Sequence, residues 1–278
     1  GRHSGERDNE MTDADHPSAA MRPAQLTLTA LPGLPLVRPG DDLGALILAG
    51  LKEADIALAA GDVIAIAQKI VSKAEGRLVR LSDVTPSARA RELAEAAQKD
   101  PRFVEVVLSE SKEVLRTRFN TLIVEHRLGF VCANAGVDRS NVAPHGEGHE
   151  EYLLCLPGDP DGTCRQLRER FRAETGVDVA VIINDSHGRA WRTGTVGVAI
   201  GAAGFPSLLD MRGHRDLFDY TLQVTQIGLA DELAAAASLL MGQADEGRPV
   251  VHIRGVPYPF REGSAQELIR PKEMDLFR

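Results

Sequence analysis

The run of residues 177–183, rich in Val and Ile and set between a helix signal and a polar stretch, limits the fold more than any other segment. Asp159-Pro160 is typical of a helix start, and the pattern after it predicts a helix to Glu174. Gly176 is the residue type expected just past a helix C-terminus. An apolar run of this length is typical of a strand buried on both faces. A helix that leads into such a strand indicates an architecture built from both strands and helices.

The other patterns mix strands and helices without regular alternation. Alternating or short apolar runs predict strands over 25–31, 63–67, 130–133, 222–226 and 250–254, and a hairpin of 114–119 and 121–125. A glycine-spaced apolar stretch leads to Gly204. Helical spacing predicts helices over 43–54, 86–99, 101–111 and 228–241, with a short one near 264–269. Residues 68–76 form a polar stretch after the strand at 63–67. Pro86 and Pro101 are each expected in the first turn of their helix. We therefore predict an α+β, or irregular mixed α/β, fold.

The charge balance argues against nucleic acid as a partner. The 278 residues include 32 basic and 40 acidic side chains, for a net charge of −8. An acidic chain offers no net positive field to a polyanion. Aromatic residues make up only 4% of the chain, too few for a base-stacking platform.

The same survey argues against a membrane or secreted protein. No apolar run approaches the length that a membrane helix needs. Cys132, Cys155 and Cys164 match no zinc or disulfide spacing, so we expect a reducing, cytoplasmic compartment. Residues 1–23 are charged and lack an apolar segment, and we expect them to be a disordered N-terminal lead before a domain over 24–278.

Common nucleotide and hydrolase motifs are missing from the sequence. It contains no G-x-x-x-x-G-K-[ST], no G-x-G-x-x-G after a strand and no G-x-S-x-G. What remains is a set of three polar clusters near predicted strand ends. Such positions often carry binding sites in proteins that combine strands and helices.

The first cluster lies in a predicted loop after the strand at 130–133. Asp138 and Asn141 are three residues apart there, and a turn could direct both at one ligand. The alternative is that both side chains only bind their own backbone, as Asp and Asn commonly do in turns.

The second cluster follows the buried strand. Asp185 and Ser186 could bind Mg²⁺ or Mn²⁺ through oxygen, and Arg189 and Arg192 could bind phosphate or carboxylate oxygens. Alternatively, Asp185 caps the next element and both arginines are solvated.

The third cluster begins where the strand at 63–67 ends. Lys69 and Lys73 are four residues apart on a predicted helical turn, which suits binding of phosphate. A solvated helix face is the more common role for such a pair.

Two further patterns are set aside. The tract at 145–150, HGEGHE, resembles a metal-binding sequence, but its glycines disfavour a helix that would align the ligands. Asp185, Ser186 and His187 are consecutive, so they cannot by themselves form a Ser-His-Asp triad.

Five segments taken in order resemble the coenzyme F420-0:L-glutamate ligase family. They are LPGLPLV at 31–37, KIVSKAEGR at 69–77, GVDRSN at 136–141, DSHGRAWR at 185–192 and LMGQ at 240–243. The likeness extends in order over nearly all of residues 30–277. It implies a two-lobed mixed α/β fold peculiar to that family, which forms a homodimer.

The resemblance also implies an activity. Members add L-glutamate to the lactyl phosphate side chain of the deazaflavin coenzyme and extend it by γ-linkage, using GTP and divalent cations. Two Mg²⁺ or Mn²⁺ ions are implied, and a monovalent cation such as K⁺ is a family expectation. Some relatives carry a fused flavin reductase domain, which we expect to be absent because this sequence stops at Arg278.

Site residues follow from the resemblance by motif position. The implied metal ligands are Asp138, Asp185, Ser186 and Gln243. The implied GTP contacts are Leu34, Pro35, Leu36, Val37, Gln68, Lys73, Asn141, Met241, Gly242, Gln243, Ala244, Asp245, Glu246, Gly247 and Arg248.

The chain departs from the family pattern at three of its positions. Ser186 stands where threonine is usual, which retains the ligating oxygen. Relatives tend to carry a hydroxyl residue at the position of Gln68. Asn184 before Asp185 is also unusual.

The chemistry fits these residues. A carboxylate is a poor acyl donor, so it first attacks the γ-phosphate of GTP, and glutamate's amine then attacks the acyl phosphate. Metals and basic side chains would neutralise the transferring group. Arg189 and Arg192 are our own candidates for this clamp. A non-catalytic GTP-binding homologue and a ligase for another phosphorylated carboxylate remain the alternatives.

Overall fold

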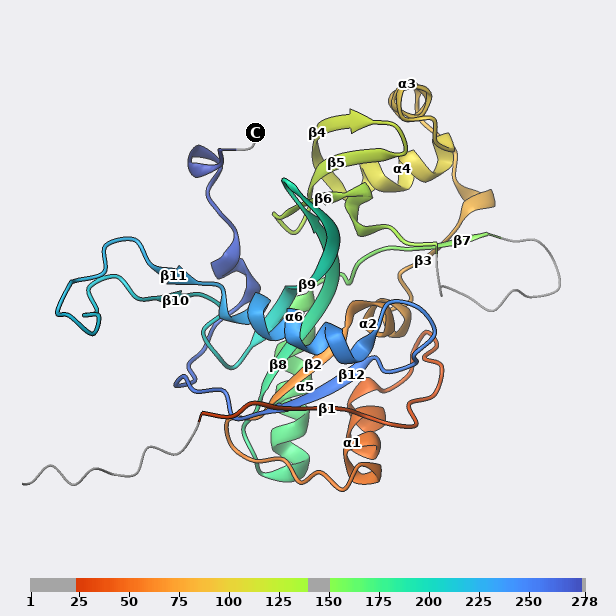
Figure 1. Ribbon diagram of the computed structural model, residues 1–278. Coiled ribbons are helices and arrows are strands. Elements are labelled where there is room, and N and C mark those ends of the chain that lie inside the picture. The colour runs from red at the N-terminus through yellow and green to blue at the C-terminus, as the bar shows by residue number, and fades with distance from the viewer. Residues whose placement is uncertain (1–23, 140–150, 277–278) are drawn as a thin grey trace, which may run out of the picture.

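A five-stranded sheet forms the centre of the molecule, as the computed structural model of residues 24–139 and 151–276 shows (Figure 1). Its strand order is β1-β12-β2-β8-β9. β2 and β8 are parallel, and the other neighbours are antiparallel. The strands are β1 (Thr27–Ala30), β2 (Val63–Ala67), β8 (Ala180–Arg189), β9 (Arg192–Ala203) and β12 (Val250–Arg254).

Helices cover both faces of this sheet. On one face, α1 (Leu43–Glu53), α2 (Gln68–Ala74) and α5 (Pro160–Thr175) pack on alternate strand residues such as Ile64 and Val181. On the other face, α6 (Leu229–Met241) packs on the intervening residues. Because successive strand side chains point to opposite faces, the apolar runs of β2 and β8 supply both cores.

A smaller antiparallel sheet has a separate core. Its strands are β4 (Ser111–Arg118), β5 (Thr121–His126) and β6 (Val131–Ala133), in that order. The helices α3 (Ala88–Ala97) and α4 (Pro101–Ser109) pack on it. The long β8–β9 hairpin extends from the central sheet toward this small sheet (Figure 1).

Short elements complete the described chain. β3 (Leu78–Arg80) pairs with β7 (Tyr152–Leu154), and β10 (Leu209–Asp210) pairs with β11 (Gln226–Ile227). The segment between β10 and β11 projects from the body as an arm (Figure 1). The 3₁₀ turns are η1 (Leu81–Asp83), η2 (Asn134–Gly136), η3 (Ala265–Leu268) and η4 (Lys272–Met274).

Most predicted elements are confirmed, and so is the mixed α/β class. The strands at 63–67 and 250–254 have the expected bounds. Asp42 caps α1 by accepting a hydrogen bond from Ala45 N, and Gly176 ends α5 with a φ of 73°. The expected hairpin turns at Asn120, whose φ is 58°. The two lobes and the homodimer stay predictions, and the expected disordered lead lies outside the described residues.

Three expectations were wrong. The strand predicted to end at 183 continues to Arg189, because it goes on pairing with β9 beyond the apolar core. Pro86 precedes the N-cap Ser87 instead of occupying the first turn, whereas Pro101 does occupy it. Of the strand expected over 222–226, only Gln226 is in β11.

The three cysteines and the helix lengths bear on the expectations about disulfides and membrane helices. All three cysteines are free and buried. Within residues 24–139 and 151–276, no helix combines the length and apolarity that crossing a membrane requires.

Candidate functional site

Polar residues meet where the parallel strands β2 and β8 reach the same edge of the central sheet. Ala67, the last residue of β2, is in register with Asn184 of β8. Gln68 follows β2 directly, and Asp185 and Ser186 follow Asn184. Since parallel strands present their carboxyl ends together, two of the three sequence clusters are brought to this edge.

Continuation of β8 places Asp185 and Ser186 on opposite faces of the strand. Both residues pair with β9, Asp185 with Val198 and Ser186 with Gly197. A register shift in this pairing directly precedes Asn184. The two side chains therefore cannot lie side by side, as they could in a loop, and each meets different neighbours.

Asp185 is held by a histidine on its own face of the strand. Its Oδ2 lies 3.0 Å from Nε2 of His187, and the two side chains are 15% and 14% exposed. The ring of Phe130 packs against His187 with ring centroids 5.4 Å apart. Burial, followed by the charge of Asp185, raises the pKa of the Cys132 thiol to about 12.

Ser186 contacts Gln243, a residue from a distant segment. The serine Oγ donates a hydrogen bond to Oε1 of Gln243 over 2.9 Å, across 57 positions of sequence. Gln243 begins the loop between α6 and β12, directly after Gly242, whose φ is 73° and ψ is −177°. This contact brings together two of the four metal ligands expected from sequence.

Asp138 is paired with a lysine from the helix that follows β2. Its Oδ2 lies 2.7 Å from Nζ of Lys69. Its backbone exchanges hydrogen bonds of 3.0 and 2.9 Å with Leu154. Lys73 lies one turn further along α2, and burial together with the charge of Lys69 lowers its pKa. A cation at Asp138 would compete with the Lys69 ammonium for the same carboxylate.

The donors at this edge fit a hard divalent cation by their chemistry. Two carboxylates, a hydroxyl and an amide oxygen are ligand types that Mg²⁺ and Mn²⁺ accept. Within the described ranges, no group of three or more His, Cys, Asp and Glu side chains is placed to hold a metal. A metal here would therefore depend on Ser186 and Gln243 in addition to the two carboxylates.

The expected nucleotide contacts come from three described segments. Residues 34–37 form a loop after β1, in which Leu36 is exposed and Val37 is buried. In the loop after α6, Met241 is buried and residues 243–248 are exposed. Gln68 is buried and its Oε1 accepts a hydrogen bond of 3.0 Å from Ser72 Oγ. Asn141 and the tract at 145–150 lie outside the described residues.

The two arginines of the second cluster lie at the far end of the β8–β9 hairpin. Arg189 pairs with Arg192 across the turn, and Arg189 Nη1 donates to the carbonyl of Gly194 over 3.0 Å. Four residues of strand separate Arg189 from Asp185, which corresponds to about 13 Å. A role for these arginines as a clamp on phosphate or carboxylate oxygens stays a prediction.

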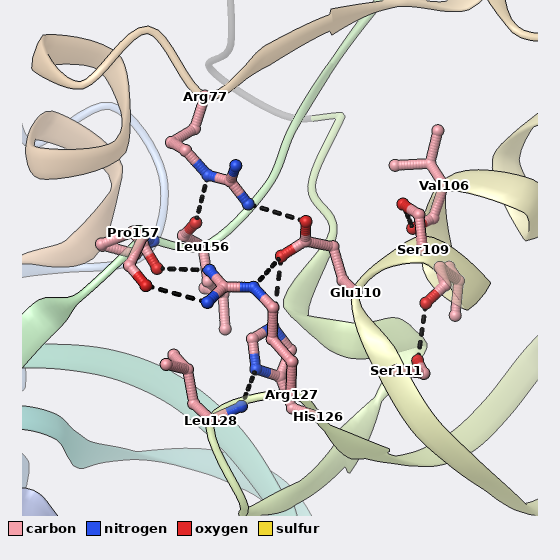
Figure 2. A network of polar contacts seen from close by, with 12 residues as sticks. Arg77, Val106, Ser109, Glu110, Ser111, His126, Arg127, Leu128, Leu156 and Pro157 are labelled. Atoms are coloured by element: carbon pink, nitrogen blue, oxygen red, sulfur yellow. Dashed lines mark hydrogen bonds and ion pairs between the residues drawn. The ribbon is translucent and has the colours of Figure 1, made fainter.

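A polar network missed by sequence reasoning joins the small sheet to the rest of the chain (Figure 2). Glu110 Oε1 accepts from Arg77 over 2.7 Å, and its Oε2 accepts from Arg127 over 2.9 Å. Arg127 also donates to the carbonyls of Pro157 and Gly158. Burial raises the pKa of Glu110, but contacts with His126, Arg127 and Arg77 outweigh it and lower the pKa to about 2.

The contact of His187 with Asp185 was also missed, although a signal for it existed. The two residues are two positions apart, and strand residues at that spacing share a face. A strand that ends at residue 183 does not include this pair, so the apolar pattern alone does not reveal it. No comparable spacing signal links Lys69 to Asp138 or Arg77 to Glu110, because those partners are far apart in sequence.

These features define a mixed α/β protein with an oxygen-rich polar site at the carboxyl ends of two parallel strands. The sequence pattern described as F420-0:Gamma-glutamyl ligase matches residues 33–255. The chain therefore belongs to the F420-0:gamma-glutamyl ligase family.

Similar proteins carry the name coenzyme F420:L-glutamate ligase. One from Methanothermobacter thermautotrophicus is 46% identical over 255 residues, covering 91% of this chain and 99% of the relative. One from Methanopyrus kandleri is 50% identical over 246 residues, covering 87% and 93%. One from Archaeoglobus fulgidus is 44% identical over 246 residues, covering 88% and 94%.

Proposed function

We propose that this protein is a GTP-dependent ligase that adds L-glutamate to coenzyme F420-0 and extends the product by γ-linkage, as a step of coenzyme F420 biosynthesis. The relatives named above support the substrates. The observation that carries the proposal is the Ser186–Gln243 hydrogen bond at the carboxyl end of the β2–β8 pair. It joins two expected metal ligands from separate segments in a chain that belongs to the ligase family.

The reaction proceeds in two displacements. The substrate carboxylate attacks the γ-phosphorus of GTP, the bond to the β-phosphate oxygen breaks, and GDP leaves. The amine of glutamate then attacks the acyl phosphate carbonyl, loses a proton and forms the amide, while phosphate leaves. Positioning and charge neutralisation provide most of the catalysis in phosphoryl transfer.

The expected metal ligands come from separate segments at the sheet edge. Asp138, Asp185, Ser186 and Gln243 hold two divalent cations, Mg²⁺ or Mn²⁺, and a K⁺ ion is a further expectation. Bound divalent cations neutralise the charge that develops on the transferring phosphoryl group. Asp185 is oriented for its task by the hydrogen bond with His187.

The nucleotide is held by segments around the same edge. Lys73, the 34–37 loop and the 241–248 loop bind GTP, with Gln68 and Asn141 as further contacts. Lys73 supports this role because the structure assigns it no hydrogen bond or ion pair within the described residues, and its partly buried ammonium is suited to a phosphate. Arg189 and Arg192 bind phosphate or carboxylate oxygens of the substrates.

We propose that the protein acts as a homodimer in the cytoplasm. The arm between β10 and β11 exposes Leu217 by 97% and Phe218 by 89%. Large exposed apolar side chains that project from the body favour a protein partner. A second copy of this chain is the partner that the family implies. The three free cysteines are consistent with a reducing compartment.

Mass spectrometry of the product tests the proposal. The purified protein is incubated with F420-0, L-glutamate, GTP and Mn²⁺, and parallel samples replace GTP with ATP or omit the metal. We expect successive additions of one glutamyl residue only when GTP and metal are both present.

The other outcomes separate the alternatives. Metal-dependent binding of GTP without any added glutamate would favour a non-catalytic homologue. Glutamate-dependent release of phosphate from GTP with another phosphorylated carboxylate, but not with F420-0, would favour a ligase with a different substrate. Addition of glutamate without GTP would contradict the proposed mechanism.

A further inference from the structure

A polar cavity lies on the small sheet, away from the edge of the central sheet. Its volume is about 390 Å³. Three turns form it: the α3–α4 connection, the β4–β5 turn and the segment after η2. The residues that line it are Gln98, Lys99, Asp100, Phe103, Asn120, Val137 and Arg139.

Two cations converge on one aromatic ring in this cavity. Lys99 Nζ lies 4.5 Å and Arg139 Cζ 5.0 Å from the centre of the Phe103 ring. A ring face attracts cations, but two like charges at one ring repel each other. Burial, followed by the charge of Arg139, lowers the pKa of Lys99. Neither cation has an ion pair within the described chain.

The acidic residue of the cavity is already engaged. Asp100 Oδ2 accepts from Arg102 Nη2 over 2.7 Å, and Oδ1 accepts from Arg102 Nε over 3.1 Å. Asp100 also caps α4 by accepting from the backbone N–H of Arg102. Hydrogen bonds from Arg102 are the main cause of its lowered pKa, to which the charge of Arg139 also contributes. Asp100 therefore attracts Arg139 electrostatically, but the two side chains do not form an ion pair.

Two amide side chains complete the polar lining. Gln98 is the C-cap residue of α3 and Asn120 lies in the β4–β5 turn, and both have left-handed backbones, with φ of 53° and 58°. Within the described part of the molecule, neither side-chain amide has a hydrogen-bond partner. The cavity thus offers neutral N–H donors beside a guanidinium and an ammonium, which together are the groups that bind oxyanions.

We propose that this cavity binds the oxyanion group of a small molecule, a phosphate or a carboxylate, between Lys99 and Arg139. The planar guanidinium binds two oxygens of the anion, and the lysine supplies a point charge. The site is separate from the candidate metal ligands. Val137 and Arg139 line the cavity, whereas the carboxylate of Asp138 between them contacts Lys69. A bound anion would also fix the segment that carries Asp138.

Calorimetric titration with inorganic phosphate tests the site in the full chain, with NaCl added to hold ionic strength constant. We expect Lys99→Met and Arg139→Gln each to weaken phosphate binding by about tenfold or more. Arg116→Gln is the matched control, because Arg116 is exposed on β4, where its Nη1 donates a hydrogen bond to the carbonyl of Leu115. Circular dichroism checks that each variant is folded, and Arg139→Lys should recover part of the affinity.

A parallel variant separates this proposal from the nucleotide site. Lys73→Met removes the lysine proposed to bind GTP, so it should leave phosphate binding at the cavity intact. Loss of binding in Lys73→Met alone would overturn the cavity site and favour the nucleotide site. Phosphate affinity that is unchanged by both Lys99→Met and Arg139→Gln would overturn it as well.

A second titration, with L-glutamate, identifies the source of the oxyanion. Glutamate binding that depends on Lys99 and Arg139, without phosphate binding, would assign the site to a carboxylate. The reverse would assign it to a phosphate. If neither anion binds more tightly than chloride, the proposal fails.

Discussion

Glu110 links the small sheet to the rest of the chain through ion pairs with two arginines. It is 10% exposed and bridges Arg77, which precedes β3, to Arg127, which follows β5. Both arginines also bind carbonyls of residues 156–158 (Figure 2). A buried carboxylate with two arginines is costly to disrupt, because removal of one partner leaves the other charges unpaired.

Replacing Glu110 should remove a pH-dependent contribution to stability. Its pKa is lowered from 4.5 to about 2, so the ionised form contributes about 3 kcal/mol. A lowered pKa means that this stability is complete above pH 4.5 and is lost as the pH falls toward 2. We expect Glu110→Gln to be less stable than the wild type at pH 7 by about 3 kcal/mol, with a smaller difference at pH 3. Urea unfolding at both pH values measures this.

The exposed Glu92 provides the control for that experiment. It pairs with Arg89 on the surface of α3. Glu92→Gln should change stability by less than about 1 kcal/mol at either pH. Equal effects of the Glu110 and Glu92 substitutions at pH 7 would contradict the role given to the network.

Loss of the Asp185 carboxylate should abolish activity without unfolding the protein. Asp185 lies at the outer part of β8, beyond the apolar core, so Asp185→Ala removes a ligand and leaves the packing intact. We expect glutamate addition to fall by about 100-fold or more and the melting temperature to remain close to that of the wild type. Asp83→Ala, at an exposed turn, is the control. Wild-type turnover with normal metal dependence in Asp185→Ala would refute the assignment.

Residues whose role is local were the ones that sequence could predict. Asp42 and Gly176 act within one helix end, and both were identified from their type and position. The contact of Ser186 with Gln243 was within reach only through the family resemblance. The ion pair of Lys69 with Asp138 depends on packing between distant segments, which composition and periodicity do not encode.

At the scale of elements, the end of α6 sets the position of the Gln243 loop. Gly242 has φ of 73° and ψ of −177°, a region that is essentially restricted to glycine. A Cβ at this position would lie 2.1 Å from the carboxyl carbon of Glu246. We expect Gly242→Ala to cost about 1–3 kcal/mol and to raise KM for GTP, because alanine is strained in this backbone conformation and the Glu246 carboxylate, which accepts from Ala244 N, must move. Chemical unfolding and steady-state kinetics measure the two effects.

The end of α5 offers a matched control. Gly176 also has φ of 73°, but an added Cβ would meet nothing within 4 Å. Gly176→Ala should therefore cost about 1 kcal/mol and leave KM unchanged. An unchanged KM in Gly242→Ala would show that the loop position does not matter for the nucleotide.

The bounds of an element could be predicted where its apolar periodicity reflects burial. They could not be predicted where a strand continues outside the core. β2 and β12 are buried along their lengths, so their apolar runs marked both ends correctly. The outer half of β8 is polar because it has left the core, yet its backbone still pairs with β9. Hydrogen bonding to one neighbour leaves no trace in side-chain periodicity, so residues 184–189 were predicted as loop.

At the scale of the whole molecule, we predict that the arm between β10 and β11 holds the proposed homodimer together. We expect the double substitution Leu217→Ser and Phe218→Ser to shift the protein toward the monomer, because it removes the most exposed apolar side chains of the arm. Sedimentation velocity over a range of protein concentrations measures the change. Phe119→Ser, at the tip of the β4–β5 hairpin, is the control. A wild-type monomer at all concentrations would contradict the homodimer.

The topology could not be derived from sequence, although its class could. Mixed strands and helices indicate α/β, but the last strand, β12, lies between β1 and β2 near the start of the chain. That insertion rests on pairing across nearly 190 residues, as between His252 and Ile64. Such contacts follow from the packing of the complete core, and no local pattern specifies them.

The burial of all three cysteines makes the molecule well suited to site-directed labelling. Desolvation raises the pKa of the Cys155 thiol to about 11 and that of Cys164 well above its usual value, as it does for Cys132. Since the thiolate is the reactive form, native cysteines should resist maleimides at neutral pH. A single cysteine introduced by Gln223→Cys, at an exposed polar position of the same arm, would carry the only reactive thiol. A spin label or fluorophore there would report how far apart two arms lie in solution, without removal of any native cysteine.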